Sequence, residues 1–197
     1  MTELTHDMLG EIAAKYLKRR GWNFALSNLW SAMITEKPDC LAFDLYGNTF
    51  LVEAKMSRAD FFADQKKWSR KRPELAAGSY RAYITPPGLL KVEEVPYGWQ
   101  LWEVTPGKRP VVKVVKGQEF YKSQCPWSSS KRMIELKRFV NCDQTEFEHF
   151  AQSQSVLRRA YDWLLVIVRR AEASGIDMQQ FAASDELWRK GRPAKND

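Results

Sequence analysis

The sequence is poor in the residues that build disulfide frameworks and zinc sites. It has three cysteines, an odd number with no CxxC pair, and two histidines that do not lie at zinc-ligand spacing from a cysteine. This pattern is typical of reduced thiols, so we expect a cytoplasmic protein. No apolar signal core follows the N-terminal residues, and the most apolar run, Leu164 to Val168, is far too short to span a bilayer. We therefore expect no membrane partner.

Several signatures of common enzyme classes are also missing. The sequence contains no P-loop, no GxGxxG after a predicted strand, no GxSxG elbow and no paired-histidine motif. The sequence therefore gives no support for a P-loop or dinucleotide-binding enzyme, an α/β-hydrolase or a zinc protease.

Basic residues, in contrast, are in surplus. The 31 Lys and Arg against 24 Asp and Glu give a formal net charge of +7. Such a charge favours polyanionic partners, because each neutralised phosphate releases condensed counterions. A basic surface that serves solubility alone is the alternative. Nucleic acid is the favoured partner.

The order of elements predicts an α/β domain over residues 1–118. Its first helix has the clearest pattern, with apolar residues at helical spacing from Leu9 to Leu17, a Thr5 N-cap and Gly21 as the stop. A hairpin follows, and then a helix that begins at Ser57. The expected elements are a helix over 5–20, strands over 40–45, 49–55, 80–84, 100–105 and 111–115, and a helix over 57–68. Residues 119–197 are predicted as a helical extension, with helices over 130–140, 145–173 and 178–188.

The hairpin carries the residues best suited to chemistry. Glu53 and Lys55 are two positions apart and so share one face of a strand. A three-residue loop pairs Leu45 with Thr49 and places Asp39 opposite Lys55, close enough to share a metal site with Glu53. Asp44, nearer the turn, is the weaker ligand candidate. A solvated strand face with an ordinary Glu–Lys pattern is the other interpretation.

Pro38-Asp39, followed across a hairpin by Glu53-Ala54-Lys55, resembles the signature of the PD-(D/E)xK nuclease superfamily. The preceding Gly10-Glu11-Ile12-Ala13-Ala14 matches the first helix of that superfamily. The segments 52–61 and 83–88, with Asp64, Lys67 and Trp68, resemble its MmcB-like, DNA-repair-associated branch. The resemblance covers about the first half of the chain. It implies a restriction-endonuclease-like core, a mixed central sheet flanked by helices.

The resemblance also implies roles for individual residues. Asp39 and Glu53 would bind Mg²⁺ or Mn²⁺ with the Ala54 carbonyl, Lys55 would be the catalytic cation, and Glu11 an auxiliary catalytic and metal-binding carboxylate. Glu11 has an alternative, because Lys15 stands four residues on, the spacing of a surface ion pair.

The segment after the hairpin contains the densest positive run of the chain. We expect its basic residues to bind nucleic-acid phosphates and Trp68 to pack into the core. Ser57 is expected to cap its helix, and Asp60 and Asp64 are either supporting residues of the site or ordinary helix residues. The predicted phosphate-binding residues are Lys66, Lys67, Arg70, Lys71 and Arg72.

The expected function is metal-dependent hydrolysis of DNA phosphodiester bonds, in repair, recombination, or mobile-element or defence processing. The alternative is a catalytically silent nuclease-fold module that binds DNA or recruits a partner protein. RNA as substrate, endonucleolytic or exonucleolytic cutting, and a homodimer all stay open from the sequence.

Overall fold

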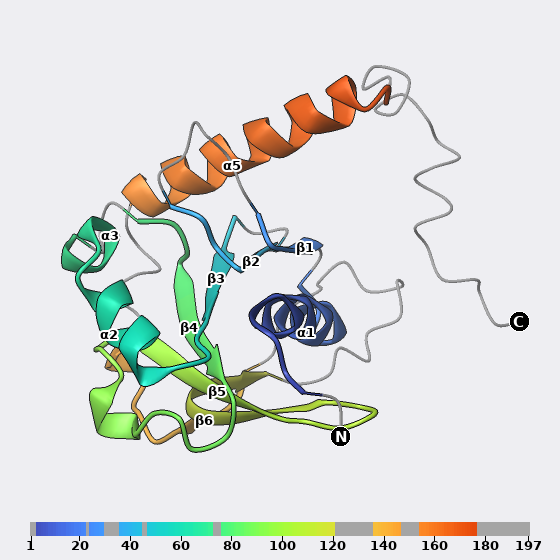
Figure 1. Cartoon of the computed structure of the whole chain (residues 1–197). Coiled ribbons are helices and arrows are strands. Elements are labelled where there is room, and N and C mark those ends of the chain that lie inside the picture. Colours follow the sequence, from blue (N-terminus) through green and yellow to red (C-terminus); the bar gives the residue numbers. More distant parts are fainter. Residues whose placement is uncertain are drawn as a thin grey trace, which may run out of the picture.

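The computed structural model describes residues 3–22, 24–29, 36–44, 47–72, 76–120, 136–146 and 154–176. Its first 120 residues contain both helices and strands, as expected of an α/β fold (Figure 1). The helices are α1 (His6–Arg19), α2 (Arg58–Gln65), α3 (Trp68–Lys71) and α5 (Gln154–Ala173), with a short 3-10 helix at Val92–Glu94. The strands are β1 (Phe24–Ser27), β2 (Cys40–Phe43), β3 (Thr49–Ala54), β4 (Tyr80–Thr85), β5 (Trp99–Thr105), β6 (Val111–Phe120) and β7 (Leu136–Val140).

The strands form one mixed sheet in the order β1-β2-β3-β4-β5-β6-β7. The central pairs β3–β4 and β4–β5 are parallel, and the remaining pairs are antiparallel. The chain passes from β3 to β4 through α2 and α3, because a parallel neighbour needs a long crossover connection. The α/β class is therefore confirmed as a seven-stranded mixed sheet flanked by helices.

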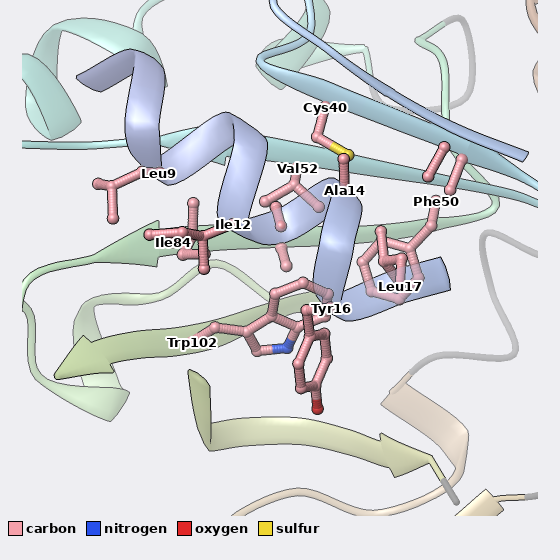
Figure 2. Packing of buried hydrophobic residues seen from close by; sticks show 14 of the residues in the cluster. Leu9, Ile12, Ala14, Tyr16, Leu17, Cys40, Phe50, Val52, Ile84 and Trp102 are labelled. Atoms are coloured by element: carbon pink, nitrogen blue, oxygen red, sulfur yellow. The ribbon is translucent and has the colours of Figure 1, made fainter. Parts of the chain in front are cut away.

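Alternation along the strands divides the core into two layers. Even-numbered residues of the central strands, such as Phe50, Val52 and Trp102, pack with α1 in one cluster. Figure 2 shows this face, where Tyr16 of α1 lies beside Trp102 with the ring centroids 5.0 Å apart. Odd-numbered residues form the second cluster with residues of α2 and α5; these are Leu41, Leu51, Tyr83, Leu101, Phe61, Ala160 and Trp163.

The two predicted helix caps are confirmed. Met8 N donates to Thr5 Oγ1 at 3.3 Å, and Asp60 N donates to Ser57 Oγ at 3.1 Å. Each hydroxyl satisfies one amide that the first helical turn leaves without a partner. Ser57 thereby fixes where the chain turns away from the end of β3.

The hairpin exists, but its predicted register is wrong by two residues. Phe43 pairs with Thr49 and Cys40 with Val52, so the connection spans residues 44–48. Asp44 explains the longer turn, because its carboxylate accepts from the Asn48 backbone at 2.8 Å and side chain at 2.7 Å. Continued by one step, the register sets Asp39 opposite Glu53 instead of Lys55. A shift of two keeps every side chain on its predicted face.

The C-terminal part differs from the expectation of a purely helical extension. The predicted helix over 130–140 is wrong where it is described, because β7 (Leu136–Val140) pairs antiparallel with β6. The long helix is confirmed as α5, and the helix predicted over 178–188 lies outside the described residues. β7 and α5 both lie after residue 118, where the domain boundary was predicted. β7 pairs with β6, and α5 packs against the sheet. None of the described helices is long and apolar enough to cross a membrane.

Candidate active site

Asp39, Glu53 and Lys55, the three residues predicted to form the site, lie at the end of β3. Glu53 and Lys55 lie on the sheet face that also carries Leu51, and both side chains are almost fully buried. Asp39 precedes β2, and its Oδ2 accepts from the Ala54 backbone amide at 2.8 Å. This bond ties the carboxylate to the strand that carries the other two residues. The predicted convergence of Asp39, Glu53 and Lys55 is therefore present in the structure.

Lys55 stands between two carboxylates. Its Nζ lies 3.4 Å from Glu53 Oε2 and 3.5 Å from Asp64 Oδ1. The side chains of Lys55, Glu53 and Asp64 are 3%, 4% and 0% exposed, so this charge is held in a dry environment. Interactions between such charges are screened little by salt.

Arg70 of α3 belongs to the same cluster and contacts three of its carboxylates. Its guanidinium contacts Glu53 Oε1 at 2.9 Å, Asp64 Oδ2 at 2.7 Å and Glu36 Oε1 at 2.9 Å. The guanidinium carbon also lies 4.7 Å from the centroid of the Trp99 ring. A planar group with several fixed N–H donors suits such a site better than a lysine does.

Asp64 is the most heavily bonded acid of the cluster. Besides Arg70 and Lys55, it accepts from the Tyr83 hydroxyl at 3.0 Å and pairs with Lys67 Nζ at 2.7 Å. Asp64 thus belongs to the site, whereas Asp60, one turn earlier, is exposed and follows the Ser57 cap. Of the two interpretations of these acids, the structure supports the first for Asp64 and the second for Asp60.

The environment shifts the pKa values of the acids in different directions. Burial raises the pKa of Glu53 to about 7, although the charges of Arg70 and Lys55 act to lower it. Burial also raises the pKa of Asp39, against the Ala54 amide. For Asp64 the raising effect of burial is outweighed by the hydrogen bond and charge of Arg70, so its pKa is lowered. Asp64 therefore supports the cations, while burial makes the ionised forms of Glu53 and Asp39 less favourable, an effect that an additional cation would oppose.

Two residues of the site were not expected from the sequence. Glu36 accepts from Arg70 and from the Ala77 amide, at 2.6 Å, and so joins two loops beside the site. His6, the first residue of α1, places Nε2 3.5 Å from Asp39 Oδ2. The position of Glu36 just before Pro38-Asp39 was the available signal. His6 has no motif around it.

Glu11 is not part of the cluster. Its carboxylate pairs with Lys15 Nζ at 3.5 Å, with 53% of the Glu11 side chain exposed. It lies on α1, which packs on the sheet face opposite Glu53 and Lys55. The surface ion pair weighed as the alternative is what the structure shows.

The basic run is divided between interior and surface. Arg70, expected on a phosphate-binding surface, is held inside by three carboxylates, and its side chain is only 6% exposed. Trp68, expected in the core, is 52% exposed, so that prediction is wrong. The exposed basic residues of the run are Lys66, Lys67, Lys71 and Arg72.

An open pocket of about 400 Å³ leads from this surface to Glu53. The residues that line it include Glu36, Glu53, Lys67, Trp68 and Arg70. A ligand that enters the pocket therefore meets exposed cations and an indole first, and buried carboxylates at the base.

The cluster offers oxygen donors to a divalent cation, but few of them. Across the part of the chain that the structure describes, no group of three or more His, Cys, Asp or Glu is placed to hold a metal ion. Asp39 and Glu53 supply hard oxygen donors from neighbouring strands, in addition to the backbone. Mg²⁺ suits such a sparse set, because it commonly binds one or two carboxylates and keeps several waters. The residues fit such an ion in chemical type.

Comparisons with known proteins identify no family for this chain. No protein-family model matches the chain, and no curated protein matches it. Among solved structures, the chain is similar to the SPO1766 protein of unknown function from Silicibacter pomeroyi. That match has a TM-score of 0.44 and 16% sequence identity, and covers 87% of this chain and 96% of the other.

Proposed function

We propose that this chain is a metal-dependent nuclease with a restriction-endonuclease-like core, which hydrolyses phosphodiester bonds of DNA. The observation that carries the proposal is the convergence of Asp39, Glu53 and Lys55 at one end of the β2–β3 pair. Asp39 is bonded to the Ala54 amide at 2.8 Å, and Lys55 Nζ lies 3.4 Å from Glu53. Metal-assisted phosphodiester hydrolysis needs carboxylates and a cation in one place, and two carboxylates and one lysine lie together at this end of the two strands.

Each residue has a distinct task in this proposal. Asp39 and Glu53 would hold the divalent cation, Mg²⁺ or Mn²⁺, which supplies charge neutralisation on the phosphate and activation of water at neutral pH. Lys55 Nζ lies beside Glu53, where it would stabilise negative charge that develops on the phosphate. Asp64 contacts both Lys55 and Arg70 and so orients them, and Tyr83 holds Asp64 through its hydroxyl.

The surface around the pocket suits a polynucleotide. Lys66, Lys67, Lys71 and Arg72 are exposed beside the pocket that leads to Glu53. Lysine and arginine neutralise backbone phosphates, and an exposed indole such as Trp68 stacks on a base of a single strand. The proposal therefore assigns substrate binding to this surface. Arg70 is buried behind it and contacts Glu53 and Asp64.

One observation favours a second candidate, a nuclease-fold module that binds DNA without cutting it. Both Glu53 oxygens already lie beside cations, with Arg70 at 2.9 Å and Lys55 at 3.4 Å. The negative charge of Glu53 is thus compensated within the protein, which reduces its attraction for a metal ion.

Cleavage of end-labelled single-stranded, duplex and branched DNA, and of matching RNA, in Mg²⁺, Mn²⁺ or EDTA separates these candidates. We expect metal-dependent cleavage by the native protein, a loss of at least about 100-fold in Asp39→Asn and Lys55→Met, and native activity in the matched control Asp60→Asn. Circular dichroism checks that each variant folds.

Two outcomes would contradict the nuclease assignment or its site. Absence of cleavage in every metal, with DNA binding retained, would favour the binding module. Cleavage that persists undiminished in folded Asp39→Asn would show that the activity belongs to other residues.

A further inference from the structure

A second pocket lies at the other end of α1, away from Glu53 and Lys55. It is open, has a volume of about 430 Å³, and is formed between the C-terminal half of α1 and the turn that joins β5 to β6. Figure 1 shows this hairpin passing beside α1. Five basic residues line the pocket and no acidic residue does; they are Lys15, Arg19, Arg20, Lys108 and Arg109.

The helix contributes three of these charges. Cations near a helix C-terminus are stabilised by the macrodipole, which by itself accounts for Arg19 and Arg20. Lys15 is partly compensated by Glu11, at 3.5 Å, in an exposed pair. The dipole therefore explains part of the cluster without a ligand.

The β5–β6 turn contributes two further charges, which the macrodipole of α1 does not explain. Lys108 and Arg109 belong to a different element, yet they face the helix cations across the same pocket. No described residue forms an ion pair with the side chains of Arg19, Lys108 or Arg109. Like charges gathered in this way repel each other unless an anion lies between them.

Arg20 lines the pocket with one donor that has no partner among the described residues. Its guanidinium carbon lies 4.2 Å from the centroid of the Tyr16 ring, which fixes the side chain against the helix. Its Nε is buried and has no hydrogen-bond partner among the described residues. Buried donors are nearly always satisfied, and an oxygen of a bound phosphate is one acceptor that would satisfy this one.

We propose that this pocket, which we name the α1–hairpin pocket (Lys15, Arg19, Arg20, Lys108 and Arg109), binds backbone phosphates of a nucleic-acid strand. Arginine forks bind phosphate oxygens in bidentate geometry, and clustered cations gain affinity through counterion release. The chain has a net charge of +7, and this pocket and the exposed Lys66, Lys67, Lys71 and Arg72 are two separate positive surfaces. The inference concerns binding alone and does not require cleavage.

The test compares two triple variants with equal loss of charge. Arg19→Gln/Lys108→Gln/Arg109→Gln alters the pocket, and Lys91→Gln/Arg158→Gln/Arg169→Gln alters exposed basic residues outside α1 and the β5–β6 turn. Binding of a fluorescent oligonucleotide, single-stranded or duplex, is measured by anisotropy in EDTA over a series of salt concentrations. EDTA prevents cutting, so this result and that of the cleavage assay are independent.

We expect the pocket variant to weaken binding about tenfold or more, with the slope of log Kd against log salt reduced by about 2–3, and the control to change Kd by less than about threefold. Equal losses in the two variants, or no loss in either, would overturn the proposal. Calorimetry with inorganic pyrophosphate distinguishes a small anion from a strand. If the pocket variant loses pyrophosphate binding but keeps its oligonucleotide affinity, the nucleic-acid assignment is wrong.

Discussion

Glu53 combines full burial with two neighbouring cations, and this combination determines how it responds to pH. Its side chain is 4% exposed, and Arg70 and Lys55 lie 2.9 and 3.4 Å from its oxygens. Burial nevertheless raises its pKa from about 4.5 to about 7. Near neutral pH, the protonated and ionised forms of this residue therefore coexist.

A pH dependence of both stability and activity follows from this pKa. The raised value means that the fold favours protonated Glu53, so its stabilising contribution is complete below the ordinary pKa of about 4.5 and is lost as pH rises through about 7. We expect the free energy of unfolding, measured in urea, to fall over this window by up to about 3 kcal/mol more in the native protein than in Glu53→Gln. Cleavage, which needs the ionised carboxylate, should rise through the same window.

The control for this prediction is Asp60→Asn, which removes an exposed acid of the next helix. It should keep the native pH dependence of unfolding. If Glu53→Gln also keeps it, the raised pKa of Glu53 is not the cause.

The residues of the site differ in how far the sequence predicted them. The convergence of Asp39, Glu53 and Lys55 could be predicted because alternation along a strand determines which side chains share a face, and the register error of two residues left that face unchanged. Arg70 was placed on the wrong surface, because nothing in a uniformly basic run distinguishes the one cation whose partners lie far away in sequence. Glu36 and Glu53 are those partners.

At the scale of elements, α1 and the chain before β2 approach each other unusually closely. A Cβ at Gly10 would lie 2.6 Å from the Asp39 backbone oxygen and 3.0 Å from Asn28 Oδ1. The contact therefore positions the backbone of a predicted metal ligand against a helix. Only a residue without a side chain permits this distance.

Gly10→Ala tests this contact, because two effects oppose each other. Alanine favours the helix by about 1 kcal/mol over glycine, whereas forcing a methyl group into a packed contact costs about 1–3 kcal/mol. We expect net destabilisation in urea unfolding, together with reduced metal-dependent cleavage because Asp39 is displaced. Lys15→Ala, at an exposed site of the same helix, should change stability by less than about 0.5 kcal/mol. Stabilisation by Gly10→Ala would contradict the close contact.

Elements were predictable where the information was local. The caps of α1 and α2 and the strand pattern of β2 and β3 were read correctly from neighbouring residues. The hairpin register was not, because the bonds from Asn48 to Asp44 extend the turn beyond the expected loop. β7 was mistaken for a helix, since its strand conformation depends on pairing with β6 and β-propensity is weak without such context.

At the scale of the whole molecule, the question is whether the C-terminal part is an appendage or a part of the core. The sequence predicted a boundary at residue 118. In the structure, β7 extends the sheet, and Trp163 of α5 is 0% exposed within the cluster that contains Tyr83 and Trp99. The same cluster covers the sheet face on which Glu53 and Lys55 lie. Burial of a tryptophan there connects the stability of the candidate site to α5.

Trp163→Ala measures that connection. Removing a fully buried tryptophan should lower the free energy of unfolding by about 3–5 kcal/mol, because the cavity adds to the lost transfer energy. Leu164→Ala is the matched control on the same helix; Leu164 is 41% exposed, so a loss below about 1 kcal/mol is expected. A single cooperative urea transition, shifted in Trp163→Ala and nearly unchanged in Leu164→Ala, would mean that residues beyond 118 fold together with the sheet. Small and equal shifts in the two variants would instead mean that α5 adds little to the core, and that the segment up to residue 118 is the unit that supports the site.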